Sequence, residues 1–354
     1  MKGIILHGGH GTRLRPLTHT GPKQLLPIAN KPMSQYGIEA MISSGIDEIA
    51  IIIGGIGANK VREYYGNGER FGVKFSYIEQ DQPKGIAHAI SLCKNFIMNE
   101  KFLVFLGDNI LKDSITKYGE EFQKSNADAS IVLCKVENPS RFGIADIKNE
   151  KIIKIIEKPK EPPTNLAVIG VYFLTPKIFD VIDRLKPSWR NELEITDALQ
   201  MLLKENNNII YNTVSENWKD TGTPEDIIQA NHIILKDLKP YFHAKKDESV
   251  TIEGNILVGK NTIIKNGTKL IGPIIIGEDC EIESAVIGPN TSISNHTKIS
   301  KGNISDSIIM ENCEIDCNCK IKDSIISNNS KILQNNNSDE EEKFLLGEGT
   351  KIFL

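Results

Sequence analysis

The sequence lacks any apolar run that approaches the roughly 20 residues of a membrane-spanning helix. It also lacks a strong charge of either sign, because 42 Lys and Arg stand against 46 Asp and Glu, for a formal net charge of -4. That balance offers no general attraction to nucleic acid or to an anionic membrane, so neither is an expected partner. No signal-peptide layout precedes the first apolar run, and we expect cytoplasmic residence. The rest of the composition, 25% charged and 40% hydrophobic over 354 residues, is that of a globular protein with room for two domains.

The six cysteines lack the paired Cys-x-x-Cys spacing of most zinc sites, so a metal role for the last three is poorly supported. They also show no disulfide framework, which fits a reducing compartment. We expect several of them to be small core residues, for a reason given by the repeats below. The six are Cys93, Cys134, Cys280, Cys313, Cys317 and Cys319.

A glycine-rich segment follows the first apolar run, Gly3–Leu6, which reads as a buried strand. Three glycines in the next five positions, Gly8, Gly9 and Gly11, let the backbone approach a bound group closely. Exposed amides at a strand end favour a phosphate, and Arg13 adds a cation. The segment is neither a P-loop, which ends in Gly-Lys-Ser/Thr, nor a dinucleotide fingerprint, which requires a third glycine where Leu14 stands. It indicates a nucleoside triphosphate site of another kind.

Residues 1 to about 240 alternate strand-like and helix-like segments, which is typical of an α/β domain with a mainly parallel sheet. Near-continuous Ile, Val and Leu in the strand candidates indicate burial on both faces. Ligands of such sheets bind beyond the carboxyl ends of the strands, where both the glycine-rich segment and Gly107–Asn109 lie. The strand candidates are Ile46–Ile53, Phe102–Leu106, Ser130–Val136 and Ala167–Phe173, and the amphipathic segments between strands include Met33–Ser44 and Gly85–Ile97.

From about Val250 the period changes, and an apolar residue recurs at nearly every sixth position as far as Ile332. A small residue follows four positions after many of them. This hexapeptide period indicates a parallel β-helix of between four and five coils, at about 18 residues each. We assign residues 241–335 to this domain and 336–354 to an acidic linker and tail, whose apolar ends could dock on the helix end. The small residues are Thr262, Thr268, Cys280, Thr291, Thr297, Cys313 and Cys319.

Two carboxylates complete the requirements for phosphoryl transfer, which needs aligned oxygens and cations to hold the charge. Asp108 follows the Phe102–Leu106 strand, and Asp220 lies in a glycine-containing turn. Oxygen ligands of this kind suit Mg²⁺, which keeps substrate phosphates in its coordination shell. Either residue alone would more often be a turn or cap residue. Together with the glycine-rich segment they predict a Mg²⁺ site.

The glycine segment with its downstream Pro22-Lys23 resembles the sugar-1-phosphate nucleotidyltransferases. Further blocks in the same order resemble the glucose-1-phosphate thymidylyltransferases, in the long form with a hexapeptide-repeat tail. The resemblance implies a Rossmann-like nucleotidyltransferase domain at 1–240 and a left-handed β-helix, a domain that often trimerises. The matching blocks are Gly8–Arg13, Pro22–Pro27, Tyr77–Gln80, Gly85–Ala89, Gly107–Asn109, Phe142-Gly143, Glu157–Pro159, Gly170–Tyr172, Glu192–Asp197 and Trp218–Gly222.

The resemblance also implies a role for each matching position. The triphosphate would be held by the glycine segment, and the departing pyrophosphate would lie near its Arg. The catalytic residues would be Arg13, Lys23 and Asp108. Nucleotide contacts would come from Gly8, Gly9, Gly11, Thr12, Arg13, Gln24, Gln80 and Gly85; sugar-phosphate contacts from Asn109, Gly143, Glu157, Lys158, Gly170 and Arg190; and metal ligands from Asp108 and Asp220.

The reaction implied is Mg²⁺-dependent transfer from dTTP to glucose 1-phosphate, giving dTDP-glucose and pyrophosphate, by a homo-oligomer that is trimeric through the β-helix. The nearest alternative uses UTP and N-acetylglucosamine 1-phosphate, since thymine and uracil present the same edge to Gln80. That enzyme could carry a second, acetyltransferase activity with His296 as base, although His296 also suits a solvent-facing corner of the repeat. A non-enzymatic sugar-nucleotide sensor is disfavoured because the loop Arg and both carboxylates are present.

Two histidines depart from the family pattern. His7 stands where the family more often has Ala, and His10 stands where it more often has a small or basic residue. A His-x-x-His pair suggests a metal, but on a strand-to-loop turn the two side chains need not converge. We expect no metal here, with His10 a candidate contact to phosphate or base.

Overall fold

The computed structural model describes residues 1–9, 11–214, 217–333 and 341–353. The chain folds into two compact units. The first comprises Met1–His10 and Ser34–Trp218, and the second comprises Gly11–Met33 and Lys219–Leu354. The sequence predicts domains at 1–240 and 241–335 and a tail at 336–354. The compact units of the structure group residues 11–33 and 219–240 with the repeats and the tail.

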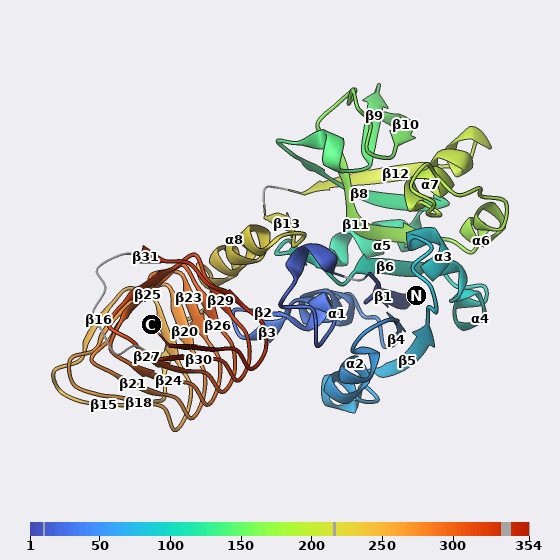
Figure 1. The fold of residues 1–354 in the computed structure, drawn as a ribbon. Coiled ribbons are helices and arrows are strands. Elements are labelled where there is room, and N and C mark those ends of the chain that lie inside the picture. The colour runs from blue at the N-terminus through green and yellow to red at the C-terminus, as the bar shows by residue number, and fades with distance from the viewer. Residues whose placement is uncertain (10, 215–216, 334–340, 354) are drawn as a thin grey trace. The chain divides into compact units, whose positions relative to one another are not determined.

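A mixed sheet of nine strands forms the centre of the first unit in the described part of the chain. Its main path runs β10-β9-β11-β6-β1-β4-β5, and β8 joins β11 to β12. Figure 1 shows this succession, with β9 and β10 at the top of the unit and β5 near the bottom. The strands are β1 (Lys2–Leu6), β4 (Glu48–Ile53), β5 (Lys74–Glu79), β6 (Phe102–Leu106), β8 (Ala129–Lys135), β9 (Ile144–Lys148), β10 (Lys151–Ile156), β11 (Leu166–Leu174) and β12 (Ile209–Val214).

The expected α/β class is confirmed, and the four strand candidates match β4, β6, β8 and β11 to within two residues. β1 pairs in parallel with β4 and β6, as β4 does with β5 and β8 with β12. β11 runs antiparallel to β6, β8 and β9. The central strands are buried on both faces, which explains their continuous apolar composition.

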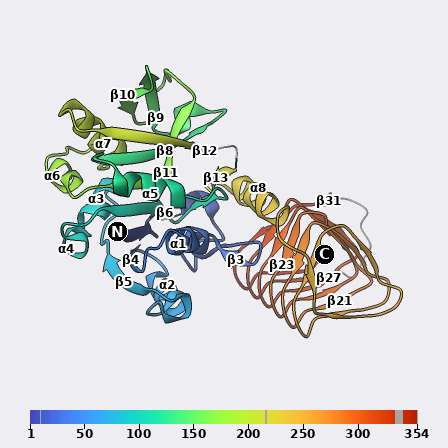
Figure 2. The ribbon, with the colours of Figure 1, turned by 180° about the vertical axis from the view of Figure 1, so that it is seen from behind.

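Helices cover both faces of this sheet. On one face Gly37 of α1 lies so close to Phe105 that a Cβ would come within 2.7 Å of its ring. On the other face, α3, α6 and α7 pack in one apolar cluster with Ile4 and Leu6 of β1; Figure 2 shows α6 and α7 from behind. The helices are α1 (Met33–Ser43), α2 (Ala58–Tyr65), α3 (Ile86–Ser91), α4 (Lys94–Ile97), α5 (Thr116–Lys124), α6 (Lys177–Ile182) and α7 (Ile195–Lys204).

The second unit contains a three-sided parallel β-helix, consistent with the left-handed form that the resemblance implied. Its three sheets have seven, seven and six rungs among the described residues, and every pairing is parallel. The first sheet consists of β14 (Tyr241–Phe242), β17 (Ile256–Val258), β20 (Ile274–Ile276), β23 (Thr291–Ile293), β26 (Ile308–Ile309), β29 (Ile325–Ile326) and β32 (Leu345–Leu346). The second consists of β15 (Lys245–Lys246), β18 (Ile263–Ile264), β21 (Glu281–Glu283), β24 (Lys298–Ser300), β27 (Glu314–Asp316), β30 (Lys331–Leu333) and β33 (Lys351–Phe353). The third consists of β16 (Thr251–Glu253), β19 (Lys269–Ile271), β22 (Val286–Ile287), β25 (Asn303–Ser305), β28 (Lys320–Lys322) and β31 (Glu341–Glu342).

The interior of the coil is built from the recurring apolar residue and the small one that follows it. The apolar positions are almost completely buried, and so are the small ones. Buried hydroxyls find partners between coils: Thr262 Oγ1 donates to the Gly277 carbonyl at 2.8 Å and accepts from the Cys280 amide at 3.0 Å. The prediction that Cys280, Cys313 and Cys319 are core residues is therefore confirmed.

The break in the hexapeptide period has a geometric origin. Leu257 pairs with Ile275, eighteen positions later, whereas Ile276 pairs with Ile293, seventeen positions later. One turn residue is lost as the coil shortens, so the apolar spacing falls from six to five between Ile282 and Ile287.

One corner of each coil holds a residue in the left-handed α conformation. Asn261, Asp279, His296, Asn312 and Asn329 have φ of 55–61°. Asn and Asp tolerate this conformation better than other residues with a side chain. His296 is therefore a corner residue, as one interpretation of the sequence expected.

The coil extends beyond the regular hexads at both ends. β14 and β15 precede the first regular hexad, and β31, β32 and β33 add a rung to each sheet after residue 335, where we ended the domain. Parallel pairing of β32 with β29 and of β33 with β30 explains how these less regular segments join the coil. The expectation of no disulfide is wrong at one place, since Cys317 and Cys319 are joined within the coil.

Four shorter segments belong to the second unit. They are the 3-10 helices Thr12–Leu14 and Lys23–Leu25, the hairpin of β2 (Pro27–Ile28) and β3 (Lys31–Pro32), and α8 (Pro224–Leu235). α8 begins with a capping box between Thr223 and Asp226. β7 (Asn109–Leu111) belongs to the first unit, and the chain passes from the first unit to the second within β13 (Trp218–Asp220).

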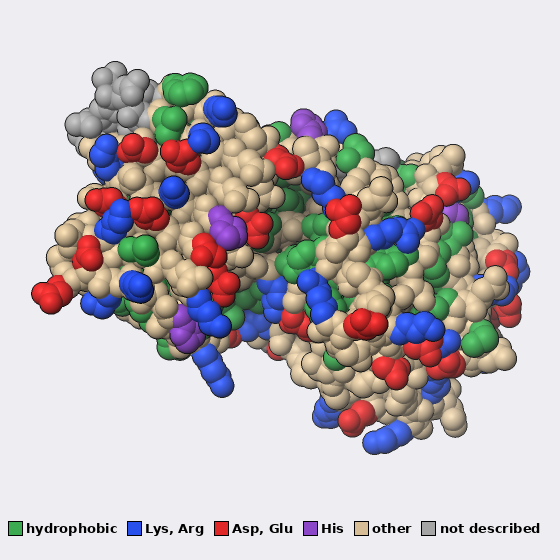
Figure 3. Space-filling model, turned by 90° about the horizontal axis from the view of Figure 1, so that it is seen from below, with side chains coloured by type: hydrophobic (Ala, Val, Ile, Leu, Met, Phe, Trp, Pro, Cys, Tyr) green, Lys and Arg blue, Asp and Glu red, His purple; other side chains and the backbone are tan. Residues whose placement is uncertain are grey.

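Two surface features bear on partners. Within the described residues, no helix has the length and apolar character needed to cross a bilayer. On the face drawn in Figure 3, Lys and Arg side chains are interspersed with Asp and Glu side chains, in keeping with the small net charge.

Candidate active site

The glycine segment begins where β1 ends, beside the end of β5. Gln80 directly follows β5 and is 7% exposed. A Cβ on Gly8 would lie 3.2 Å from Gln80 Oε1, so the bare glycine backbone and the Gln80 amide are neighbours. Gly9 has a φ of 99°, a conformation that a residue with a side chain rarely adopts. The structure therefore brings three predicted nucleotide contacts of the first unit together.

Gly85 is the fourth member of this group. Gln80 Nε2 donates to the Gly85 carbonyl at 3.4 Å and lies 2.9 Å from His88 Nδ1. Gly85 has a φ of 103°, and a Cβ there would come within 2.4 Å of the Leu193 carbonyl oxygen. Only glycine fits this position. The Gln80 side-chain amide is therefore held at the sheet edge, where it can both donate and accept hydrogen bonds.

Asp108 stands just beyond β6, half-buried. Asn109 Nδ2 donates to Asp108 Oδ1 at 2.9 Å, and Trp218 Nε1 donates to Asn109 Oδ1 at 2.6 Å. Asn109 is 4% exposed. We expected Asn109 to contact the sugar phosphate; in the structure its side chain links Trp218 to Asp108. This chain of two hydrogen bonds holds the carboxylate that the metal prediction needs.

Three predicted sugar-phosphate contacts gather around a fourth, Glu157. A Cβ on Gly143 would lie 3.3 Å from Glu157 Oε2. Lys158 Nζ and Arg190 Nη1 lie 3.3 Å and 3.5 Å from Glu157 Oε1. Thr196 Oγ1 donates to Glu157 Oε2 at 2.8 Å, which fixes the carboxylate. These residues form a cluster in which two cations and a carboxylate lie side by side.

Arg190 is shared among carboxylates. Besides Glu157 it pairs with Glu192 at 3.1 Å and with Glu194 at 3.3 Å. Burial, reinforced by the nearby Glu157 carboxylate, raises the pKa of Glu194. Burial likewise raises the pKa of Asp197, again with a contribution from Glu157. Both shifts arise where acidic groups are crowded and partly desolvated, an environment that a cation or a ligand hydroxyl would relieve.

Gly170, the remaining sugar contact, lies in the middle of β11. A Cβ there would come within 2.7 Å of Leu106 Cγ, at the end of β6. The close approach of β6 and β11 therefore accounts for a glycine at position 170 without any contact to a sugar.

The second unit holds the rest of the glycine segment. Gly11, with a φ of 57°, begins the Thr12–Leu14 helix, and Thr18 Oγ1 donates to its carbonyl at 2.8 Å. Thr12 and Arg13 are exposed. A Cβ on Gly222 would lie 3.4 Å from Arg13 Nη1 and 3.1 Å from Asp220 Oδ2. The loop cation and the second predicted metal ligand are therefore neighbours.

Lys23 and Gln24 lie in the short helix that follows Pro22 in the same unit. Gln24 is 1% exposed and Lys23 is half-buried. The predicted metal pair, in contrast, is divided: Asp108 belongs to the first unit and Asp220 to the second. Carboxylate oxygens suit a hard cation such as Mg²⁺. Within the described residues, no group of three or more His, Cys, Asp or Glu side chains could hold a metal, including the C-terminal cysteines.

His7 is a buried aromatic residue at the end of β1. It is 1% exposed, and its ring meets that of Tyr65 edge-on at a centroid distance of 5.7 Å. Burial lowers the pKa of His7 to about 3, against a small opposing effect of Asp108, so the ring is neutral at physiological pH. His10 lies outside the described residues.

Sequence reasoning missed His88, Glu194 and Thr196 as partners of the site. All three stand inside blocks that carried the resemblance, Gly85–Ala89 and Glu192–Asp197. Their side chains hold other functional groups in place, and nothing in a linear pattern distinguishes such a role from that of an ordinary polar residue on the surface. Gln80 and His88 are eight residues apart, and Glu157 and Thr196 are thirty-nine apart, so these pairs form only in the folded chain.

Comparison with known proteins matches residues 2–237 to the nucleotidyl transferase family and residues 270–352 to the GMPPB C-terminal domain. The low-salt glycan biosynthesis nucleotidyltransferase Agl11 of Haloferax volcanii is 40% identical over 88% of this chain and 87% of its own. A glucose-1-phosphate thymidylyltransferase of Streptomyces antibioticus is 38% identical over the same shares. The bifunctional protein GlmU of Methanococcus aeolicus is 36% identical over 88% of this chain and 73% of its own.

A solved structure resembles about two thirds of this chain. The crystal structure of a putative glucose-1-phosphate thymidylyltransferase from Bacillus anthracis, in complex with a sucrose, has a TM-score of 0.64 and 43% sequence identity. It covers 68% of this chain, and this chain covers 98% of it. With a family match over most of the chain and several relatives above 30% identity, this chain belongs to the nucleotidyl transferase family and is an enzyme of that class.

Proposed function

We propose that this enzyme transfers a thymidylyl group from dTTP to glucose 1-phosphate, giving dTDP-glucose and pyrophosphate, with Mg²⁺ as its metal. The observation that carries the proposal is the pair of clusters in the first unit: Gln80 with Gly85, and Glu157 with Lys158 and Arg190. The first suits a base edge and the second suits a phosphorylated sugar. The similarity to thymidylyltransferases supports the choice of substrates.

Each cluster has a distinct part in this reaction. The Gln80 amide donates to and accepts from the polar edge of the pyrimidine. The Glu157 carboxylate accepts hydrogen bonds from sugar hydroxyls. Lys158 and Arg190 balance the negative charge of the sugar phosphate. Lys23 and Arg13 oppose the negative charge that grows on the α-phosphate and on the departing pyrophosphate.

The sugar-phosphate oxygen attacks the α-phosphorus in line, and the bond to pyrophosphate breaks. The attacking oxygen is already ionised at neutral pH, so no general base is required. Asp108 and Asp220 would hold Mg²⁺, which would neutralise phosphate charge when bound. Asn109 and Trp218 orient the Asp108 carboxylate.

The test is pyrophosphate release, measured with Mg²⁺ for five nucleoside triphosphates against the 1-phosphates of glucose, N-acetylglucosamine and mannose. We expect turnover to centre on dTTP and glucose 1-phosphate and to fall at least about 100-fold in Asp108→Asn. Asp183→Asn, an exposed carboxylate that pairs with Lys94, is the matched control and should retain full activity. Turnover unchanged in Asp108→Asn would refute the metal assignment, and no turnover with any pair would refute the reaction.

A second candidate is uridylyl transfer to N-acetylglucosamine 1-phosphate together with acetyl transfer in the β-helix. The similarity to Methanococcus GlmU supports it. So does His296, whose Nδ1 lies 3.8 Å from Asp279 Oδ2 on the coil surface. Turnover centred on UTP and the amino sugar, with acetyl-CoA consumption lost in His296→Ala, would favour this candidate over the first.

The proposal includes a cytoplasmic homo-oligomer assembled through the β-helix. Ile252 and Ile263 are 40% and 42% exposed on the coil, and exposed apolar residues favour self-association. Light scattering of the full chain should give a multimer, with the trimer as our expectation, and a monomer would refute it.

A further inference from the structure

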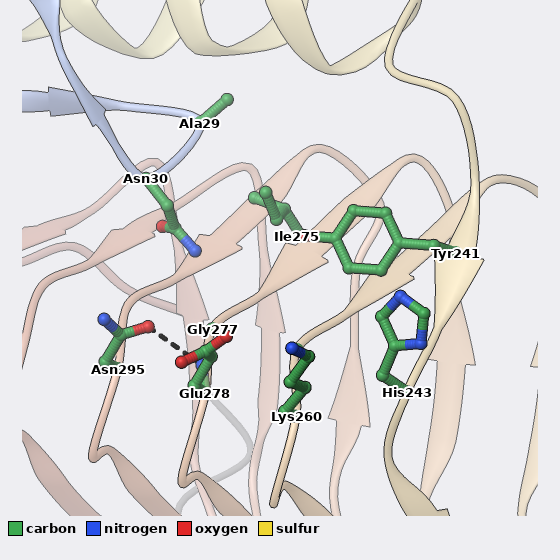
Figure 4. Close-up of a pocket in the computed structure, with 10 residues that line it drawn as sticks. Ala29, Asn30, Tyr241, His243, Lys260, Ile275, Gly277, Glu278 and Asn295 are labelled. Carbon is green, nitrogen blue, oxygen red and sulfur yellow. Dashed lines mark hydrogen bonds between the residues drawn. The ribbon is translucent and has the colours of Figure 1, made fainter. Parts of the chain in front are cut away.

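A cavity of about 430 Å³ lies in the second unit, between the β2–β3 turn and the first rungs of the β-helix. None of the residues assigned to the candidate active site lines it. Its volume is within the range of about 300–1,000 Å³ that is typical of small-molecule sites. Figure 4 shows Tyr241, His243 and Lys260 on one side, and Asn30 above Asn295 on the other.

One wall of the cavity is aromatic. The rings of Tyr241 and His243 stack with their centroids 5.2 Å apart and their planes at 24°. Ile275 continues this wall, and Tyr241 is 39% exposed. An exposed, stacked ring pair offers an apolar face to a ligand, because the negative face of a ring attracts C–H groups.

The remaining lining is polar and nearly neutral. Lys260 supplies one cation and Glu278 supplies one anion. Figure 4 shows the Lys260 ammonium pointing into the cavity. Asn295 Oδ1 accepts from the Glu278 backbone amide at 2.8 Å, which fixes the amide at the rim. A single cation would leave a triphosphate largely unbalanced, whereas this mixture of donors and acceptors suits hydroxyls.

We propose that this cavity binds a pyranose ring, which stacks one face on Tyr241 and gives its hydroxyls to Lys260, Glu278 and Asn295. The ring could come from a free hexose or hexose phosphate, or from the sugar part of a nucleotide sugar. The chemistry recognised is the same in each case.

The β2–β3 turn, which carries Ala29 and Asn30, borders the cavity and follows the proposed catalytic Lys23 in the sequence. Asn30 Nδ2 donates to the Ile293 carbonyl at 2.7 Å, and Ser294 Oγ donates to Asn30 Oδ1 at 3.1 Å. The Ala29 amide donates to Asn231 Oδ1 of α8 at 2.8 Å. These bonds hold a turn that starts only a few residues after Lys23. A ligand that contacts Asn30 would compete with these hydrogen bonds and alter the position of the turn, so the site would regulate the reaction; this step alone rests on the proposed function.

Binding is tested on the full chain by saturation-transfer NMR with glucose and glucose 6-phosphate, and by calorimetry with dTDP-glucose. We expect transfer to both small sugars, and two sites for dTDP-glucose per chain. Tyr241→Ala and Glu278→Gln should each weaken sugar binding about tenfold and leave one dTDP-glucose site. Tyr241→Phe keeps the ring and should bind as the wild type does. Lys246→Ala, at an exposed lysine of the coil that does not line the cavity, should change nothing.

The outcomes separate the proposals. Sugar binding that is equal in wild type, Tyr241→Ala and Glu278→Gln, or absent at about 10 mM, would refute the cavity site. Binding that depends on Tyr241 in a protein with no pyrophosphate release would refute the proposed reaction and keep the site. Two dTDP-glucose sites with kcat and KM unaffected by glucose 6-phosphate would refute the regulatory step, since the small sugar should alter turnover through the Asn30 turn.

Discussion

Removing the hydrogen bond from Trp218 to Asn109 tests how Asp108 is held. Trp218→Phe deletes the Nε1–H donor while keeping a ring against Phe142, whose centroid lies 5.5 Å away. Asn109 Oδ1 then loses its partner in a site where the residue is only 4% exposed. The Asn109 amide is expected to turn, and Asp108 Oδ1 would lose the donor now at 2.9 Å.

The magnitude follows from the burial of that acceptor. An unsatisfied buried acceptor costs about 1–3 kcal/mol, and smaller ring volume adds a little to this. For a unit of this size each kcal/mol lowers the Tm by about 2–4 °C, so we expect a fall of about 2–12 °C. If Asp108 binds Mg²⁺, the concentration of Mg²⁺ that gives half-maximal turnover should rise about tenfold, in line with the loss of an outer-shell partner.

Calorimetry gives the Tm, and pyrophosphate release across a Mg²⁺ series gives the metal requirement. Trp189→Phe is the matched control, because Trp189 is 81% exposed and the same substitution there should change neither quantity. A Trp218→Phe variant with the wild-type Tm and the wild-type Mg²⁺ dependence would show that the hydrogen-bond chain has no role in holding Asp108.

Two further predictions concern the glycine edge and the first strand. Gly85→Ala should raise the KM for the nucleotide at least about tenfold, because its Cβ would lie 2.4 Å from the Leu193 carbonyl oxygen at a φ of 103°. Gly72→Ala, with a φ of 72° and no atom within 4 Å of the added Cβ, should leave that KM unchanged in the same steady-state assay. His7→Leu should flatten the acid sensitivity of folding: since its pKa falls from 6.5 to about 3, the wild type loses stability by about 1.4 kcal/mol per unit as pH drops through that window. Urea unfolding from pH 4 to 7 measures the slope, and a slope equal in His7→Leu and in the exposed control His19→Leu would contradict this account.

Periodicity predicted the two architectures because it follows directly from burial. A strand buried on both faces must be apolar throughout, and Phe102–Leu106 appears in the structure with the bounds that its composition indicated. A triangular coil turns an apolar residue inward at about every sixth position, so most of the β-helix interior could be predicted from the period. Segment ends were less predictable: Gly85–Ile97, expected as one amphipathic segment, breaks into α3 and α4.

The tail shows a different limit. Leu345, Leu346 and Ile352 lack the regular period, yet they lie in strands that pair with β29 and β30. Pairing with an existing sheet edge stabilises a strand whose own pattern is weak, because the backbone hydrogen bonds are supplied by the neighbour. The disulfide between Cys317 and Cys319 was likewise not predicted, because the cysteine spacing shows no disulfide framework.

The fold class, the glycine turn and the set of charged residues could be predicted from the order of residues alone, since these depend on local propensity and on the period of burial. Which of those residues meet depends on the folded chain: Gln80 with Gly85 and His88, Glu157 with Thr196 and Arg190, and the Asn30 turn with the β-helix. Such contacts join residues up to 264 positions apart. No local pattern encodes them, because they arise when the packing of the whole chain closes long loops between distant segments.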